Sequence, residues 1–294
     1  MNLQYAPQKV LNALVRPRIR LKVDHSLNPK LLGKTYLISL MFFAIGTVLP
    51  AFLIMFIPVV LMKFDLNAAM VLFNLIFDSN GQIRVEANIT LSIVCFLTGF
   101  GAQVAYTSRA LSKRGVSLAR YLNLGCESLK GRSVSSKVAI LTAQTLFYTA
   151  VGILVEQLIT QFITPGTQPS SGLAQSAYGI YSLAFFVLAA VIAPLFEEIV
   201  FRGFLFQSLR STFRAGRDTE SRAINHRSDM LAMAVSSGVF ALIHFQFDPG
   251  IMLILFLKGC YMCEMYRRSG SLLVPIAYHS LNNALGVALV MFFH

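Results

Sequence analysis

Long uncharged apolar segments alternate with short polar segments along most of the chain. The first runs from Tyr36 to Met62 without a formal charge, which exceeds the roughly 20 residues that a helix needs to cross a bilayer core. Backbone polar groups in hydrocarbon must bond within their own segment, so such runs form helices. We predict an all-α, polytopic membrane bundle of about seven transmembrane helices, at 36–62, 89–107, 138–163, 177–206, 230–247, 250–266 and 272–293.

The predicted helices form one integral membrane domain. We divide the chain into a basic cytoplasmic N-terminal segment at 1–35, N-terminal membrane helices at 36–176, and motif-bearing helices at 177–294. The apolar stretch Phe64 to Phe77 is short for a crossing, so we interpret it as an interfacial helix, with an additional crossing as the alternative.

Basic residues gather in alternate loops. Most of the 25 Lys and Arg residues fall in the N-terminal segment, the 108–137 loop and the 207–229 loop, whereas the opposite side carries only Lys63 and Arg84. Because membrane proteins keep an excess of Lys and Arg on the cytoplasmic side, we predict a cytoplasmic N-terminus. The uncharged 164–176 loop is then external, and the plasma membrane is the expected location.

The composition agrees with a membrane protein. Hydrophobic residues make up 55% of the chain and charged residues 13%, against about 25% charged in soluble domains. The basic loops account for the net charge of +12, so we predict a lipid bilayer as partner and no nucleic acid. Cys260 and Cys263 form a lone CxxC inside an apolar segment, which we interpret as helix packing rather than a redox or zinc motif.

Ionisable residues inside membrane helices usually face the bundle interior and mark function. Glu197 and Glu198 follow Pro194 in the fourth predicted helix, and Arg202 comes four residues after Glu198. Residues four apart share a helical face, so Arg202 is expected to neutralise Glu198. Glu197 lies about 100° around the helix and is less compensated, as suits a general base.

Three further polar residues lie in later membrane helices: His244, His279 and Asn283. His279 and Asn283 are four apart and project from one face. Singly, each residue is best explained by hydrogen-bonded packing between helices. Together with a carboxylate they supply a base, two imidazoles and an amide donor, which is the equipment of a water-activating hydrolase.

The predicted helices leave one conflict of position. A straight 230–247 crossing places His244 toward the outer end, whereas Glu197 lies toward the inner end. If the two residues share a site, the fifth helix must tilt, start later or stop short.

Three motifs in order give the chain a family resemblance. EEIVFR matches EExxxR, FALIH matches FxxxH and HSLNN matches HxxxN, on separate predicted helices within about 177–293. In this the chain resembles the CPBP intramembrane proteases, the family of type II CAAX prenyl endopeptidases and bacteriocin-processing proteins. The resemblance implies that Glu197 and His244 activate water, that His279 and Asn283 stabilise the oxyanion, and that Glu198 and Arg202 support them.

The use of a metal is left open by the residues. The chain has no HExxH, whose two histidines commonly hold catalytic zinc, and Asn283 is a better hydrogen-bond donor than zinc ligand. We therefore favour a metal-free site with no required cofactor. The alternative is a divalent metal such as zinc on Glu197, His244 and His279, which would supply three protein ligands.

The function predicted from these features is intramembrane endopeptidase activity toward the cytoplasmic side. The expected partner is a membrane-associated peptide or protein with a CAAX-like or leader-type sequence. One alternative is a non-catalytic membrane adaptor or immunity protein that retains the motifs. A transporter is a weaker alternative, because the sequence shows no inverted repeat.

Overall fold

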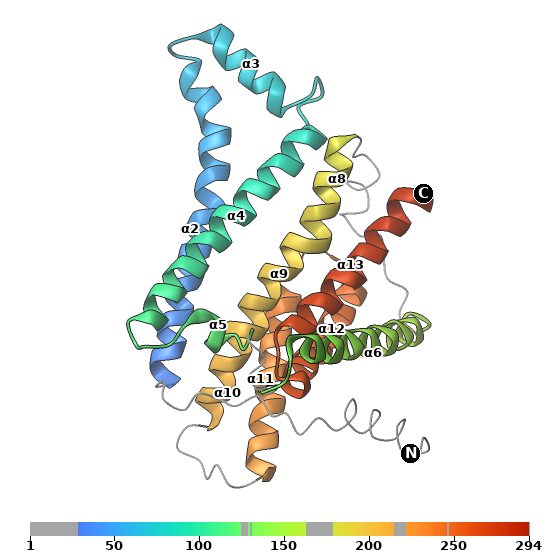
Figure 1. Cartoon of the computed structure of the whole chain (residues 1–294). Helices are drawn as coiled ribbons and strands as arrows, with labels where there is room; N and C mark the ends of the chain where they lie inside the picture. Colours follow the sequence, from blue (N-terminus) through green and yellow to red (C-terminus); the bar gives the residue numbers. More distant parts are fainter. Residues whose placement is uncertain are drawn as a thin grey trace.

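The computed structural model describes residues 29–124, 129, 131–162, 179–214, 222–245 and 247–293. These residues form helices and no strand (Figure 1), as the all-α prediction requires. The helices, in chain order, are α2 (Pro29–Leu61), α3 (Leu66–Ile76), α4 (Val85–Ser112), α5 (Leu118–Tyr121), α6 (Val134–Thr160), α8 (Ile180–Val187), η3 (Leu188–Ile192), α9 (Ala193–Glu198), η4 (Ile199–Phe206), α10 (Gln207–Arg214), α11 (Arg222–Leu242), α12 (Pro249–Ser269) and α13 (Leu273–Phe293).

Five helices in the described part of the chain are long and apolar enough to cross a membrane. One of them runs continuously from α8 to α10 over 35 residues, through the π-helical turns η3 and η4. The five are Lys34–Leu61, Val85–Ser112, Val134–Thr160, Ile180–Arg214 and Leu273–Phe292. This is a helical membrane protein, and the predicted total of about seven crossings stays a prediction.

The first membrane helices pack backbone to backbone. A Cβ added at Gly46 of α2 would lie 2.7 Å from the carbonyl oxygen of Thr98 in α4. The outer faces of this pair are covered by exposed apolar side chains, among them Leu49 and Phe52. Helix α3, which the sequence predicted as an interfacial helix, lies beyond the ends of α2 and α4 (Figure 1). The side chain of Asp65 caps its N-terminus.

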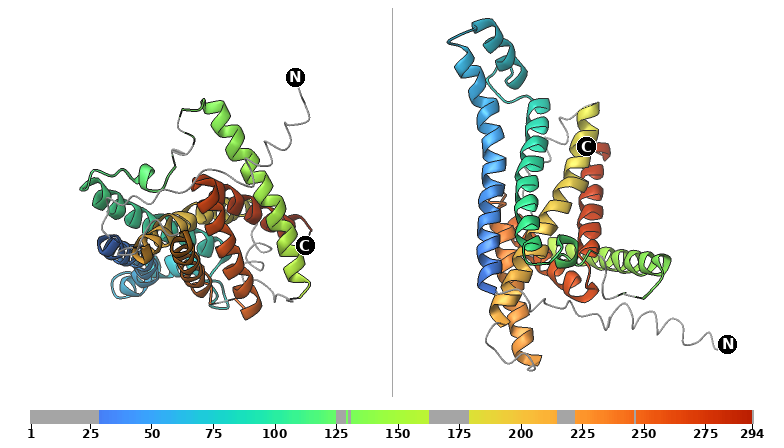
Figure 2. Two further views of the ribbon diagram at one scale, coloured as in Figure 1. Left: turned by 90° about the horizontal axis from the view of Figure 1, so that it is seen from below. Right: turned by 60° about the vertical axis from the view of Figure 1, so that its left-hand side comes forward.

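Helix α6 has a different orientation from its neighbours. Figures 1 and 2 show it lying across the direction followed by α2, α4 and α13. It packs on α13, where a Cβ added at Gly152 would lie 2.7 Å from the hydroxyl oxygen of Tyr278. The external loop predicted at 164–176 lies outside the described residues, so the path of the chain after α6 stays a prediction.

The end of α11 accounts for the conflict over His244. This helix begins at Arg222, eight residues before the expected 230, and ends at Leu242. Figure 1 shows α10 and the first turns of α11 extending at the lower end of the bundle. A turn follows Leu242, and α12 then packs along α11, so the helix ends before His244 and leaves that residue in the turn between the two helices.

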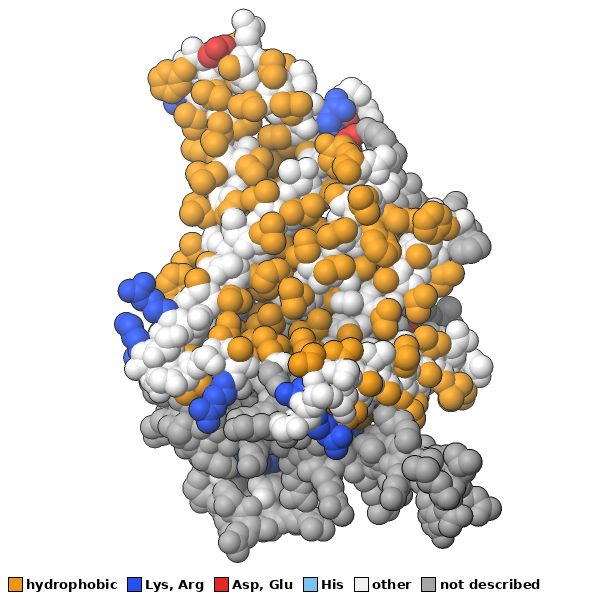
Figure 3. Space-filling model, viewed as in Figure 1, with side chains coloured by type: hydrophobic (Ala, Val, Ile, Leu, Met, Phe, Trp, Pro, Cys, Tyr) orange, Lys and Arg blue, Asp and Glu red, His pale blue; other side chains and the backbone are white. Residues whose placement is uncertain are grey.

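The described helix ends that border the predicted basic loops lie at one end of the molecule. In Figure 1, the C-terminal ends of α4, α10 and α12 are at the lower end, whereas α3 is at the opposite end. In Figure 3, Lys and Arg side chains border a broad hydrophobic surface. The two ends therefore differ in charge as predicted, and the assignment of the basic end to the cytoplasm stays a prediction.

Candidate active site

The two adjacent glutamates lie where α9 gives way to the π turn η4. Glu198 is fully buried and its Oε1 accepts a hydrogen bond of 2.8 Å from Nη1 of Arg202, also fully buried. The spacing of four residues thus produces the predicted ion pair. Glu197 keeps 15% of its side chain exposed.

His279 of α13 contacts both glutamates. Its Nδ1 lies 2.9 Å from Oε1 of Glu198, and its Nε2 lies 3.8 Å from Oε2 of Glu197. A carboxylate oxygen only accepts, so Nδ1 of His279 carries the proton in the first contact. The second distance exceeds a direct hydrogen bond and suits an intervening water. Residues 81 positions apart in the sequence are thereby joined.

Phe240 links the second histidine to this group. Its ring stacks under the guanidinium of Arg202, with the Cζ atom 4.5 Å from the ring centroid. The same ring centroid lies 4.9 Å from that of His244 and 6.3 Å from that of His279. Because Phe240 is 1% exposed, it is a fixed surface against which Arg202 and both imidazoles rest.

His244 is held in one tautomer by the end of α11. Its Nδ1 lies 2.7 Å from the carbonyl oxygen of Phe240. A carbonyl only accepts, so the neutral ring carries its proton on Nδ1 and has a lone pair on Nε2. The Nε2 atom of His244 therefore remains available as a hydrogen-bond acceptor.

Asn283 lies one turn beyond His279 on α13, and its Nδ2 donates to the carbonyl of Ala189 at 3.0 Å.

The neighbouring Asn282 belongs to a separate group. Its Oδ1 accepts from Nζ of Lys258 at 2.9 Å, and Lys258 lies 2.8 Å from Oε1 of Glu156. Glu156 and Lys258 thus form an ion pair between two helices, and Asn282 bonds to both of them.

Several polar atoms in the buried ion pair have no hydrogen-bond partner in the described structure. They are Oε2 of Glu198 and both Nε and Nη2 of Arg202. The stacked ring of Phe240 compensates the guanidinium in part, since aromatic faces attract cations. A buried pair with unused donors and an unused acceptor is sensitive to the loss of either partner.

Among the residues that the structure describes, no group of three His, Cys, Asp or Glu side chains is placed to hold a metal ion. Glu197, His244 and His279, the trio considered from the sequence, are therefore not gathered as three metal ligands. His279 directs Nδ1 to Glu198 and His244 directs Nδ1 to a backbone carbonyl, so each has only Nε2 left for a ligand.

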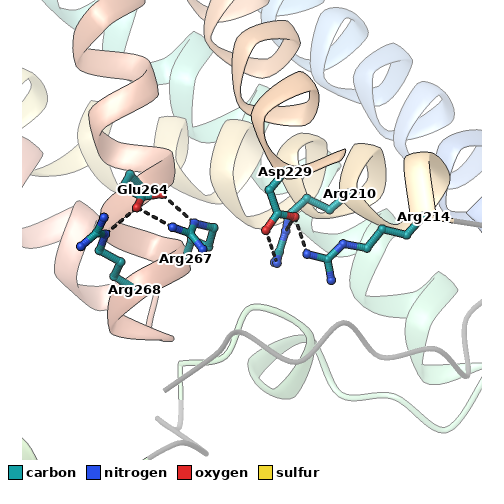
Figure 4. A network of polar contacts seen from close by, with 6 residues as sticks. All are labelled: Arg210, Arg214, Asp229, Glu264, Arg267 and Arg268. Atoms are coloured by element: carbon teal, nitrogen blue, oxygen red, sulfur yellow. Dashed lines mark hydrogen bonds and ion pairs between the residues drawn. The ribbon is translucent and has the colours of Figure 1, made fainter. Parts of the chain in front are cut away.

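The basic end of the bundle next to the site is fixed by two further ion-pair clusters (Figure 4). Arg210 and Arg214 both bond Asp229, while Arg267 and Arg268 both bond Glu264. Burial alone would raise the pKa of Asp229, but the hydrogen bonds and charges of Arg210 and Arg214 hold that pKa below its ordinary value. Arg210 and Asp229 join α10 to α11 and so connect the helix of the glutamates to the helix that ends near His244.

The structure brings four of the six residues singled out in the sequence into direct contact, and the other two are attached through neighbouring residues. Glu197, Glu198, Arg202 and His279 interact through their side chains, His244 joins them through Phe240, and Asn283 is anchored to the same long helix. Sequence reasoning missed the bond between His279 and Glu198, the role of Phe240 as a shared surface, and the Ala189 carbonyl. Phe240 was visible as the first residue of FxxxH, whereas a backbone carbonyl has no signature in the sequence.

Comparison with known proteins adds the family to this geometry. Residues 179–285 match a family model described as type II CAAX prenyl endopeptidase, Rce1-like. No curated protein matches the chain, and no solved structure does. The matched range contains all six site residues and lies within the 177–293 region of the motif resemblance. Over residues 179–285, the chain is therefore similar to the Rce1-like type II CAAX prenyl endopeptidases.

Proposed function

We propose that this protein is a membrane-embedded endopeptidase that uses a water activated by Glu197 and His244. Its substrate is a membrane-associated chain with a CAAX-like or leader-type sequence, cleaved toward the cytoplasmic side of the plasma membrane. The observation that carries the proposal is the position of His279, which contacts both adjacent glutamates from a different membrane helix. The match of residues 179–285 to an endopeptidase family model supports the same reaction class.

Glu197 is the proposed general base. It is the glutamate not held by Arg202, and the 3.8 Å between its Oε2 and Nε2 of His279 leaves a position for a bridging water. Glu197 takes a proton from this water as the water oxygen forms a bond to the scissile carbonyl carbon. On collapse of the intermediate the carbon–nitrogen bond breaks, and the same proton passes to the leaving amine.

His244 is proposed to orient the attacking water. Its Nδ1 proton is committed to the Phe240 carbonyl, so its Nε2 is available as an acceptor for a water proton. A second acceptor fixes the direction of the oxygen lone pair toward the substrate, which lowers the cost of reaching a reactive geometry.

His279 and Asn283 are the proposed oxyanion donors. With Nδ1 donating to Glu198, donation from Nε2 as well requires the charged imidazolium form. An imidazolium at His279 balances the local charge, since Glu197, Glu198 and Arg202 together carry one net negative charge. Asn283 supplies a neutral N–H, and donors fixed in advance around a developing oxyanion usually make a large contribution to catalysis.

Glu198 and Arg202 are proposed as positioning residues. Glu198 holds the ring of His279, and Arg202 neutralises Glu198 while resting on Phe240. We propose that the reaction needs no metal, because each step has a protein group to perform it.

A proteomic comparison tests the proposed function and identifies the substrate. Membrane-protein termini are compared between cells that carry the wild-type chain and cells that carry Glu197→Gln. Glu156→Gln is a matched control, because it neutralises another carboxylate in a membrane helix that lies outside the site. We expect new termini that require Glu197 but not Glu156. Identical termini in all three strains would instead favour the alternative of a non-catalytic membrane adaptor.

A further inference from the structure

A π-helical turn, η3, interrupts the long helix directly before the segment that bears the glutamates. At its end the N–H of Ala193 donates to the carbonyl of Leu188, five residues earlier, in place of the usual four. π turns are rare and frequently occur at functional sites. Asn283 on α13 faces this turn.

The carbonyl of Ala189, the residue after Leu188, has no N–H donor from its own helix because of Pro194. In the same register, the carbonyl of Ala189 would accept from the N–H of residue 194. That residue is proline, which has no N–H. A backbone carbonyl without a donor is costly inside a membrane, and the Ala189 carbonyl accepts instead from Nδ2 of Asn283 at 3.0 Å.

We infer that Pro194 and the Ala189 carbonyl are a positioning device for Asn283. An amide NH2 group has two N–H donors. Ala189 takes one of them, which fixes the plane of the amide and leaves the second N–H at a set direction for the substrate oxyanion. The inference rests on the proposed function, and it gives Pro194 a part in the reaction although its own side chain carries no reactive group.

A purely structural role for Pro194 predicts a different behaviour. Of all residues, proline inside a helix lowers helix stability most relative to alanine. If Pro194 were only structural, Pro194→Ala would therefore leave the activity unchanged and the protein as stable as before or more stable. If Pro194 positions Asn283, the same substitution restores an N–H at position 194. That N–H competes with Asn283 for the Ala189 carbonyl, and the amide loses its fixed orientation.

The decisive experiment compares Pro194→Ala with Pro50→Ala in the full-length protein. Pro50 also lies inside a membrane helix but belongs to α2, so Pro50→Ala controls for the removal of a helix proline. Pro194→Ala is expected to lower kcat about tenfold or more, short of the 10²–10³ typical of a deleted oxyanion donor. KM and the unfolding temperature should change little, and Pro50→Ala should leave kcat unchanged.

Two further variants show whether the effect passes through Asn283. If it does, Pro194→Ala combined with Asn283→Ala should be no slower than Asn283→Ala alone, because the two changes remove the same interaction. Full additivity of the two losses, or an unchanged kcat in Pro194→Ala while Asn283→Ala is impaired, would overturn the inference.

An experimental structure of Pro194→Ala separates this inference from the proposed function. If the wild-type protein cleaves nothing, the proposed function fails, and the position of Asn283 can still be measured. Loss of the contact between Nδ2 of Asn283 and the Ala189 carbonyl is the expected result. Retention of that contact would contradict the inference whatever the activity.

Discussion

Nδ1 of His279 lies 2.9 Å from Oε1 of Glu198, and the same oxygen accepts from Arg202 at 2.8 Å. One carboxylate oxygen thus joins the histidine of α13 to the arginine of the long α8–α10 helix. Glu198 is adjacent to the proposed base, so its position also determines how Glu197 faces His279. The stability of this buried pair and the chemistry of the site are therefore coupled.

Breaking that pair on one side should destabilise the protein. Glu198→Gln leaves the fully buried Arg202 without a counter-charge, and loss of one partner of a buried pair typically costs about 3–5 kcal/mol. The loss of stability is measured in detergent, by calorimetry or by the folded fraction on gel filtration. Glu264→Gln, which affects partly exposed ion pairs, should cost about 1 kcal/mol or less.

The double variant Glu198→Gln/Arg202→Met is the sharper test of the same pair. Removing both charges avoids an unpaired buried ion, so the double variant should recover much of the stability lost in Glu198→Gln. Equal stability of Glu198→Gln and the wild-type protein would show that the pair is not buried as described.

The topology is tested with single cysteines at opposite ends of α4. Asn80 and Lys113 are both exposed and lie before and after this helix. The four native cysteines are first replaced, and intact cells are then treated with a membrane-impermeant thiol reagent. We expect modification of Asn80→Cys and none of Lys113→Cys until the membrane is opened. Modification of Lys113→Cys in intact cells would reverse the predicted orientation.

The sequence predicted the parts of this structure that depend on local spacing. A separation of four residues gave the Glu198–Arg202 pair, and the uncharged runs gave the long helices. The convergence of His279 with the glutamates required the three motifs to be considered together. The orientation of α6 and the early start of α11 depend on packing between distant segments, so hydrophobicity along the chain could not predict them.

The Ala189 carbonyl is the clearest example of a site feature that the sequence could not predict. The sequence shows Pro194 shortly before the two glutamates, but the effect of this proline depends on whether the preceding turn has α or π register. Only the structure, with the Ala193 N–H bonded to the Leu188 carbonyl, shows which carbonyl is left for Asn283.

Removal of metal tests the proposed metal-free mechanism. Purified protein treated with a strong chelator and then freed of it should retain its peptidase activity, because Glu197 and His244 are proposed to activate water by themselves. Metal analysis of the same sample should show no stoichiometric zinc. Activity that is lost on stripping and restored by zinc would instead favour Glu197, His244 and His279 as ligands.

The central claim is that Glu197 is the base of a peptidase, and one measurement tests it most directly. Cleavage of an identified substrate is timed for purified wild-type protein, Glu197→Gln and Glu156→Gln, each corrected for folded protein. Glutamine nearly keeps the shape of Glu197 but cannot take a proton, so we expect kcat to fall by about 10²–10⁴ in Glu197→Gln and to stay near the wild-type value in Glu156→Gln. Full activity in Glu197→Gln would contradict the account.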